Sequence, residues 1–110
     1  MVEQARAWPN VKIVELDWDT VYAWEIQVET LLASHNLLRY ITRDAPTNLE
    51  KRFMVQQMLI NTIRKSAVVR KMRAEGWDPS EINPYDTYRA AVDAMRQMER
   101  EMITARIRSG

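Results

Sequence analysis

Most of the chain carries apolar side chains at three- and four-residue steps, the spacing of an amphipathic helix. The first stripe follows Asp17 and Asp19, either of which is a suitable N-cap, and it predicts a helix from about residue 20. Its apolar positions are Val21, Trp24, Val28, Leu31 and Leu32. The sequence Ser34-His35-Asn36 interrupts the stripe, and a second short apolar turn over residues 37–41 ends before Pro46.

The middle of the chain predicts two helices with clear boundaries. Thr47-Asn48-Leu49-Glu50 matches a capping box, in which Thr47 and Glu50 bond each other's backbone amides. The helix that follows, through Ile63, is apolar over a wide arc, so we expect it to be the central buried helix. Ser66 is expected to cap a short fourth helix, residues 67–75, which Gly76 stops.

Two Asx-Pro pairs mark the start of the last helical region. Asp78-Pro79 predicts at most one helical turn, and Asn83-Pro84 predicts the start of a long final helix. The apolar stripe of that helix is Tyr88, Ala91/Val92, Met95, Met98, Met102 and Ala105. No stretch alternates for long enough to indicate a strand. The pattern therefore predicts an all-α fold, a compact bundle of five or six helices with a long C-terminal helix.

Composition bounds the class of protein without identifying it. A chain of 110 residues with 46% hydrophobic and 28% charged side chains is typical of one globular domain. We expect an N-terminal arm over residues 1–16 and a single helical domain over residues 17–110. The sequence has no cysteine, no transmembrane-length apolar run and no signal-peptide pattern, so we expect a cytoplasmic, intracellular protein with no membrane partner.

Reactive side chains do not converge into a recognisable catalytic pattern. The single histidine, His35, lies at an expected helix end and has no partner at metal-ligand spacing. The paired carboxylates of Asp17 and Asp19 are explained as helix caps, and Gly76 is not part of a glycine-rich phosphate loop. We therefore expect no catalytic site, no metal site, no cofactor and no small-molecule substrate.

Two groups of residues are candidates for binding a partner. Arg64, Lys65, Arg70, Lys71 and Arg73 form a basic cluster without an intervening acid, which could contact nucleic acid or simply form a solvated helix face. The net charge of only +1 gives no general attraction to RNA.

The second group is apolar. Met98, Met102 and Ile103 lie in the part of the last helix that we expect to extend beyond its neighbours, and they either belong to the core or pack against another chain. Trp8, in the arm, and Trp77, in a Gly-Trp-Asp-Pro turn, are candidates for a subunit contact, although Trp77 could equally fold back onto the core. Trp24 and Trp18 are assigned to the core.

Three blocks of the sequence resemble the N-terminal region of Gag proteins from Copia-type long-terminal-repeat retrotransposons. They read YAWEIQVETLLASHNLLRYI, MLINTIRKS and NPYDTYRAAVDAM, and the first includes Trp24, Val28, Leu31-Leu32, Leu37-Leu38 and Ile41. The chain departs from that family in having Val21 where a tyrosine is common, Leu38 where a second tryptophan is found, and no zinc knuckle. The resemblance implies a helical capsid-type domain that associates with itself into a shell around RNA.

Three functional hypotheses follow. The first is a non-enzymatic Gag/capsid-like structural protein that forms homo-oligomers or particles and at most contacts RNA weakly. The second is a small helical adaptor or regulator that binds one protein partner. The third, a helical nucleic-acid-binding module, would use Arg64, Lys65, Arg70, Lys71 and Arg73.

Overall fold

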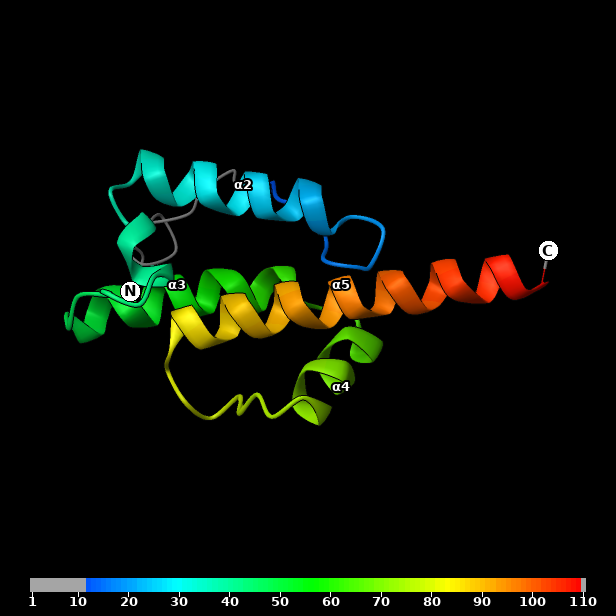
Figure 1. Ribbon diagram of the computed structural model, residues 1–110. Coiled ribbons are helices and arrows are strands. Elements are labelled where there is room, and N and C mark those ends of the chain that lie inside the picture. The colour runs from blue at the N-terminus through cyan, green and yellow to red at the C-terminus, as the bar shows by residue number, and fades with distance from the viewer. Residues whose placement is uncertain (1–11, 110) are drawn as a thin grey trace.

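The computed structural model describes residues 12–109, in which the only regular elements are four α-helices and one short 3-10 helix (Figure 1). In chain order they are α2 (Val21–Ser34), η1 (Leu38–Ile41), α3 (Leu49–Thr62), α4 (Ser66–Ala74) and α5 (Pro84–Ser109). The prediction of a helical bundle with a long last helix is confirmed, but residues 12–109 contain four α-helices, slightly fewer than the five or six helices predicted. Asp78-Pro79 forms only a turn, within the predicted limit of one helical turn, and the Asp78 carboxylate accepts the amide hydrogen of Ser80 at 2.9 Å.

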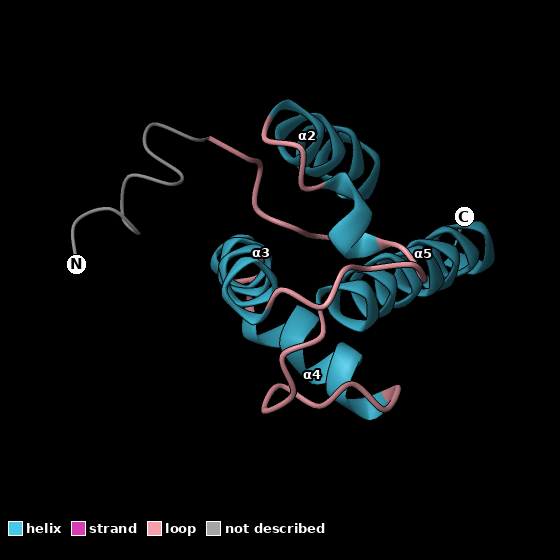
Figure 2. Cartoon of the chain, turned by 90° about the vertical axis from the view of Figure 1, so that its left-hand side faces the viewer, coloured by secondary structure: helices cyan, strands magenta, loops and turns pink. Residues whose placement is uncertain are grey.

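Helix α5 is the centre of the bundle. Each of the other described helices contacts α5, and Figures 1 and 2 show α2, α3 and α4 arranged around it. The prediction that α3 is the central helix was wrong, since α3 packs extensively only against α5 and its Phe53 is 43% exposed. The small side chains of Ala91 and Ala94, both fully buried, explain the difference because they let neighbouring helices approach α5 closely.

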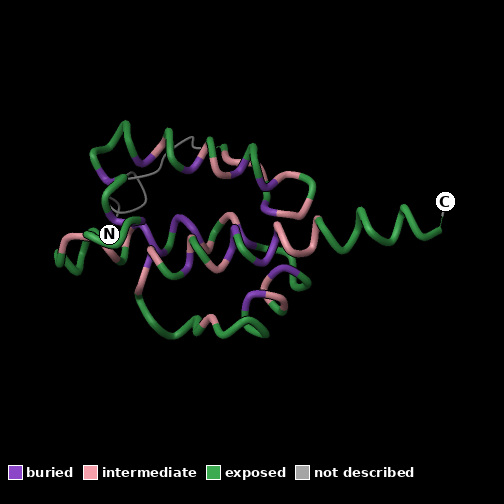
Figure 3. Tube along the Cα trace, in the orientation of Figure 1, coloured by how far each residue is buried: buried purple, intermediate pink, exposed green. Residues whose placement is uncertain are grey.

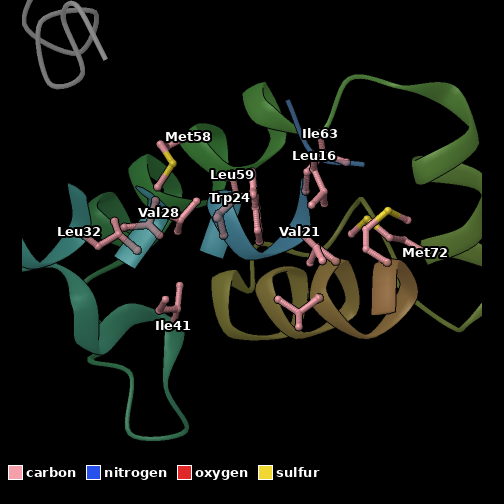
Figure 4. Packing of buried hydrophobic residues seen from close by; sticks show 14 of the residues in the cluster. Leu16, Val21, Trp24, Val28, Leu32, Ile41, Met58, Leu59, Ile63 and Met72 are labelled. Atoms are coloured by element: carbon pink, nitrogen blue, oxygen red, sulfur yellow. The ribbon is translucent and has the colours of Figure 1, made fainter. Parts of the chain in front are cut away.

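The core is formed where α2 faces α3 and α5 (Figure 4). As predicted, Val21, Trp24, Val28 and Leu32 of α2 are buried, whereas Leu31 is half-buried. The Trp24 indole N–H donates to Thr62 Oγ1 at 2.8 Å, and its ring stacks on Tyr88 with centroids 5.5 Å apart. The side chain of Trp24 thereby links α2, α3 and α5.

Residues 12–16, the described end of the expected arm, lie against the bundle. Leu16 is fully buried, and its backbone N–H donates to the carbonyl of Thr62 at 3.0 Å. The Val14 amide donates to Gln27 Oε1 at 2.8 Å. This end of the arm is therefore fastened to both α2 and α3.

Three N-caps in the structure differ from those predicted. The cap of α3 is Asn48, whose side chain accepts from the Lys51 amide at 3.0 Å, one residue after the expected Thr47. Asparagine caps at least as well as threonine, so the stronger cap takes the position.

At α2 the N-cap is Thr20 rather than Asp17 or Asp19, because the Asp17 carboxylate is bonded instead to the Trp18 amide and to Lys65. At α4 Ser66 is the first helical residue, and the N-cap position is Lys65, which forms no side-chain cap bond.

The helix starts and stops expected at Asn83 and Gly76 are confirmed. Asn83 Oδ1 accepts the amide hydrogen of Asp86, and α5 begins at Pro84. Gly76 has φ +106°, and the Gly76 and Trp77 amides donate back to the carbonyls of Arg73 and Met72. This is a Schellman ending, for which glycine is favoured because it adopts positive φ without strain.

The molecule is elongated because α5 is longer than the bundle around it. Its radius of gyration is 14.8 Å, against about 13 Å for a compact domain of this length. The C-terminal part of α5 projects from the body in Figure 1, and Figure 3 shows that part exposed. Despite its length, α5 lacks the apolar content of a bilayer-crossing segment, as do the other helices within residues 12–109.

Candidate functional site

The projecting end of α5 carries an exposed apolar surface, as expected from its length. Met95 is fully buried and Met98 packs against the edge of the core. Beyond them Met102 is 41% exposed, Ile103 47% and Ile107 74%. All residues from 100 to 109 are exposed, so these apolar side chains are only partly covered by the rest of the described chain. We call residues 98–109 the α5 tail.

The apolar side chains of the α5 tail form two strips. At about 100° per residue, Met98, Met102 and Ala105 fall within one narrow arc of the helix. Ile103 and Ile107 form a second strip on another side. The two strips are separated on one flank by Glu99 and Arg106.

Two contacts fix the base of the α5 tail to the body from opposite flanks. Lys71 Nζ of α4 lies 3.4 Å from the Glu101 carboxylate. The Arg106 guanidinium lies over the Trp18 ring, 5.9 Å from its centroid. The strip of Met98 and Met102 therefore lies between one flank of α5 that is tied to α4 and another that is tied to the segment before α2.

Trp77, an expected subunit contact, covers the core of its own chain. Its ring is half-buried and packs against the core, and its indole N–H donates to Thr87 Oγ1 at 2.9 Å. Thr87 in turn donates to Gln56 Oε1 at 3.0 Å, and Gln56 Nε2 donates to the carbonyl of Glu81. The other expected tryptophan contact, Trp8, lies outside the described residues.

The buried polar pair Gln56 and Thr87 was not anticipated from the sequence. Their exposed fractions are 2% and 0%, and they connect α3, α5 and the loop between α4 and α5. The sequence feature that could have indicated this pair is the position of Thr87, one helical turn before Ala91 on the buried face of α5. A threonine on such a face needs a hydrogen-bond partner from a neighbouring element.

The basic cluster divides into engaged and exposed side chains. Lys65 Nζ lies 2.7 Å from Asp17 Oδ2, an ion pair that lowers the pKa of Asp17 and raises that of Lys65. Arg64 donates to the carbonyl of Asn61 at 2.8 Å, and Lys71 faces Glu101. The remaining members, Arg70 and Arg73, are exposed on α4.

Other ionisable groups join helices rather than converging on one point. Arg96 of α5 is paired with Glu25 of α2 at 2.9 Å, and Tyr88 is hydrogen-bonded to Glu29. Burial, followed by the bond to Glu29, raises the pKa of Tyr88. His35 is exposed at the C-terminal cap of α2, and no group of three or more potential metal ligands occurs within residues 12–109.

Comparison of the chain with protein-family models, with curated proteins and with solved structures finds no match. The geometry of the described residues therefore carries the functional argument. Its most distinctive feature is the α5 tail.

Proposed function

We propose that this chain is a cytoplasmic, non-enzymatic structural protein that associates with itself through the α5 tail into homo-oligomers or particles. The observation that carries the proposal is the exposure of Met102, Ile103 and Ile107 on a helix that continues beyond its own core. Exposed apolar side chains gathered at one projecting end of a helix, here in two strips, mark an interaction surface.

The charge of the chain supports association of identical copies. A formal charge of +1 on 110 residues produces little repulsion between subunits. Met98 and Met102 are flexible and polarisable, so they can fit a partner surface without a preformed pocket. A symmetric assembly repeats the same modest interface, and its stability therefore does not need one large contact area.

The resemblance to Copia-type Gag proteins gives the proposal its more specific form, a capsid-like domain. Residues that carry the resemblance, Trp24, Val28 and Leu32, are all buried in α2. Tyr88, from the third resembling block, stacks on Trp24 from the first. The resembling positions therefore coincide with the packing that holds α2 against α5.

The test is the oligomeric state of matched double variants. Met102→Glu with Ile103→Glu places two charges on the α5 tail, and Ile26→Glu with Leu49→Glu places the same two charges on exposed positions of α2 and α3. Light scattering across a concentration series, with negative-stain images of the heaviest fraction, reports assembly.

We expect wild type and the Ile26/Leu49 control to form the same oligomers, and the Met102/Ile103 variant to remain monomeric. A wild-type monomer at every concentration and salt would overturn the proposal and favour an adaptor that binds a different protein. Oligomers that persist in the Met102/Ile103 variant would also overturn it, because association would then use another surface.

A further inference from the structure

We propose that two copies of this chain pair through their α5 tails as an antiparallel coiled coil, with Met102 of each copy opposite Ala105 of the other. This inference rests on the proposed self-association and specifies its geometry. It commits to a second copy of the chain as the occupant of the strip formed by Met98, Met102 and Ala105. The second strip, Ile103 and Ile107, lies outside this seam on the outer side of the pair.

The first observation is a heptad spacing that runs the length of α5. Apolar or small residues at alternating three- and four-residue steps are typical of a coiled-coil seam. The seam positions are Tyr88, Ala91, Met95, Met98, Met102, Ala105 and Ser109. Ala91 and Met95 are fully buried by the chain's own helices, whereas Met102, Ala105 and Ser109 are exposed. The same seam thus packs inside one subunit and then continues without a partner.

The second observation is the charge pattern that flanks the exposed seam. Glu99 and Arg106 lie on one flank, and Glu101 and Arg108 lie on the other. In an antiparallel pair each flank meets the same flank of the partner. With Met102 opposite Ala105 of the partner subunit, Glu99 faces Arg106 of the partner subunit and Glu101 faces Arg108 of the partner subunit.

The two-fold symmetry repeats both of these pairs, so each glutamate of the flanks meets an arginine. Complementary charges at the flanking positions select the partner and the orientation of a coiled coil. The α5 tail is complementary to itself in this orientation.

The fold also excludes the parallel arrangement and the other register. A parallel partner would run beside Met95 and Ala91, where α2, α3 and α4 already pack on α5. Sliding the antiparallel partner by one heptad toward the body would require Met95, which is fully buried.

The two contacts at the base of the tail support this orientation. Trp18 holds Arg106 on one flank of the seam and Lys71 holds Glu101 on the other. Met102 is therefore exposed between two charged flanks whose directions are already restricted.

Charge reversal at position 99 distinguishes the orientations. In the antiparallel pair Glu99→Lys faces Arg106 of the partner subunit twice, and we expect the dimer to weaken about tenfold. The double variant Glu99→Lys/Arg106→Glu restores opposite charges, and we expect its affinity to return close to wild type. In a parallel pair position 99 faces the buried Ala94, so the single change would be neutral and the double change harmful.

A distance measurement on the intact chain provides an independent test. The sequence has no cysteine, so Asp93→Cys gives one spin label at an exposed position of α5. In the antiparallel pair the two labels are separated by the equivalent of 21 residues along the helices, or about 32 Å. A parallel pair would place them at the same height on the outer sides of two adjacent helices, about 20 Å apart. Circular dichroism of each variant checks that the helices are retained.

The outcomes separate this inference from the proposed function. Weakening by Glu99→Lys, rescue by the double variant and a label distance near 32 Å would establish the antiparallel pair. Oligomers that depend on Met102 and Ile103 but ignore both charge changes, or that give the short distance, would overturn the inference and leave self-association standing. A wild-type monomer would overturn both.

Discussion

The buried hydrogen bonds of Thr87 provide the sharpest test of what holds this bundle together. Thr87→Val keeps the shape of the side chain but removes a hydroxyl that accepts from the Trp77 indole and donates to Gln56 Oε1. Gln56 is 2% exposed, so its oxygen is left without a partner and without water. Trp77 is only half-buried, and its N–H regains part of its hydration.

An unsatisfied buried polar group costs about 1–3 kcal/mol. Because one of the two groups is partly rehydrated, we expect Thr87→Val to lower the free energy of unfolding by about 2–3 kcal/mol. For a domain of this size that corresponds to a fall in Tm of about 10–15 °C. Denaturant unfolding followed by far-UV circular dichroism measures the free energy directly.

The control is Thr104→Val, which makes the same change at an exposed position of α5. It corrects for the propensity of valine in a helix, and we expect a change within about 0.5 kcal/mol. A double-mutant cycle with Trp77→Phe should show coupling, since either change alone breaks the same hydrogen bond. A Thr87→Val variant as stable as Thr104→Val would refute the reasoning, because the network would then contribute nothing.

Two further predictions concern the chain away from this network. Gly76→Ala should destabilise the protein by about 1–2 kcal/mol through backbone strain at φ +106°. Nothing lies within 4 Å of the added Cβ, so no steric clash contributes. An unchanged denaturation midpoint would contradict this prediction. The Asp17–Lys65 pair lowers the pKa of Asp17 from 3.8, so its stabilisation is present above that pH and is lost as the pH falls through the folded value. Because the folded pKa of Asp17 lies below 3.8, the stability curves of wild type and Asp17→Asn should converge only below that folded value. A constant gap down to the lowest pH at which the protein stays folded would exclude the ion pair as its cause.

Local sequence patterns were sufficient to predict those features that depend on helical periodicity or on local backbone conformation. The stripe of Val21, Trp24 and Val28, the helix start at Asn83 and the stop at Gly76 were all predicted correctly. Each depends on helical periodicity or on the backbone preferences of one or two residues. The length of the last helix, and hence the projection of the α5 tail, follows from the same signals.

Competition between nearby caps was less predictable. Thr47 and Asn48 are both good caps and lie one residue apart, so the sequence pattern alone does not decide between them. Asp17 fails to cap α2 because Lys65, 48 residues away in sequence, takes its carboxylate. Periodicity carries no information about such a distant partner.

The tertiary structure alone decided which helix is central and which polar groups are buried. The width of the apolar arc on a helix predicts the width of its buried face, and the arc of α3 is wider than that of α5. The number of helices that pack on α5 depends instead on the small side chains of Ala91 and Ala94. Gln56 and Thr87 are buried because their partners come from other elements, and those partners exist only once the helices are assembled. The sequence by itself determined the helices and the length of α5. Packing determined where the core ends along that helix, and it thereby left Met102 and its neighbours exposed.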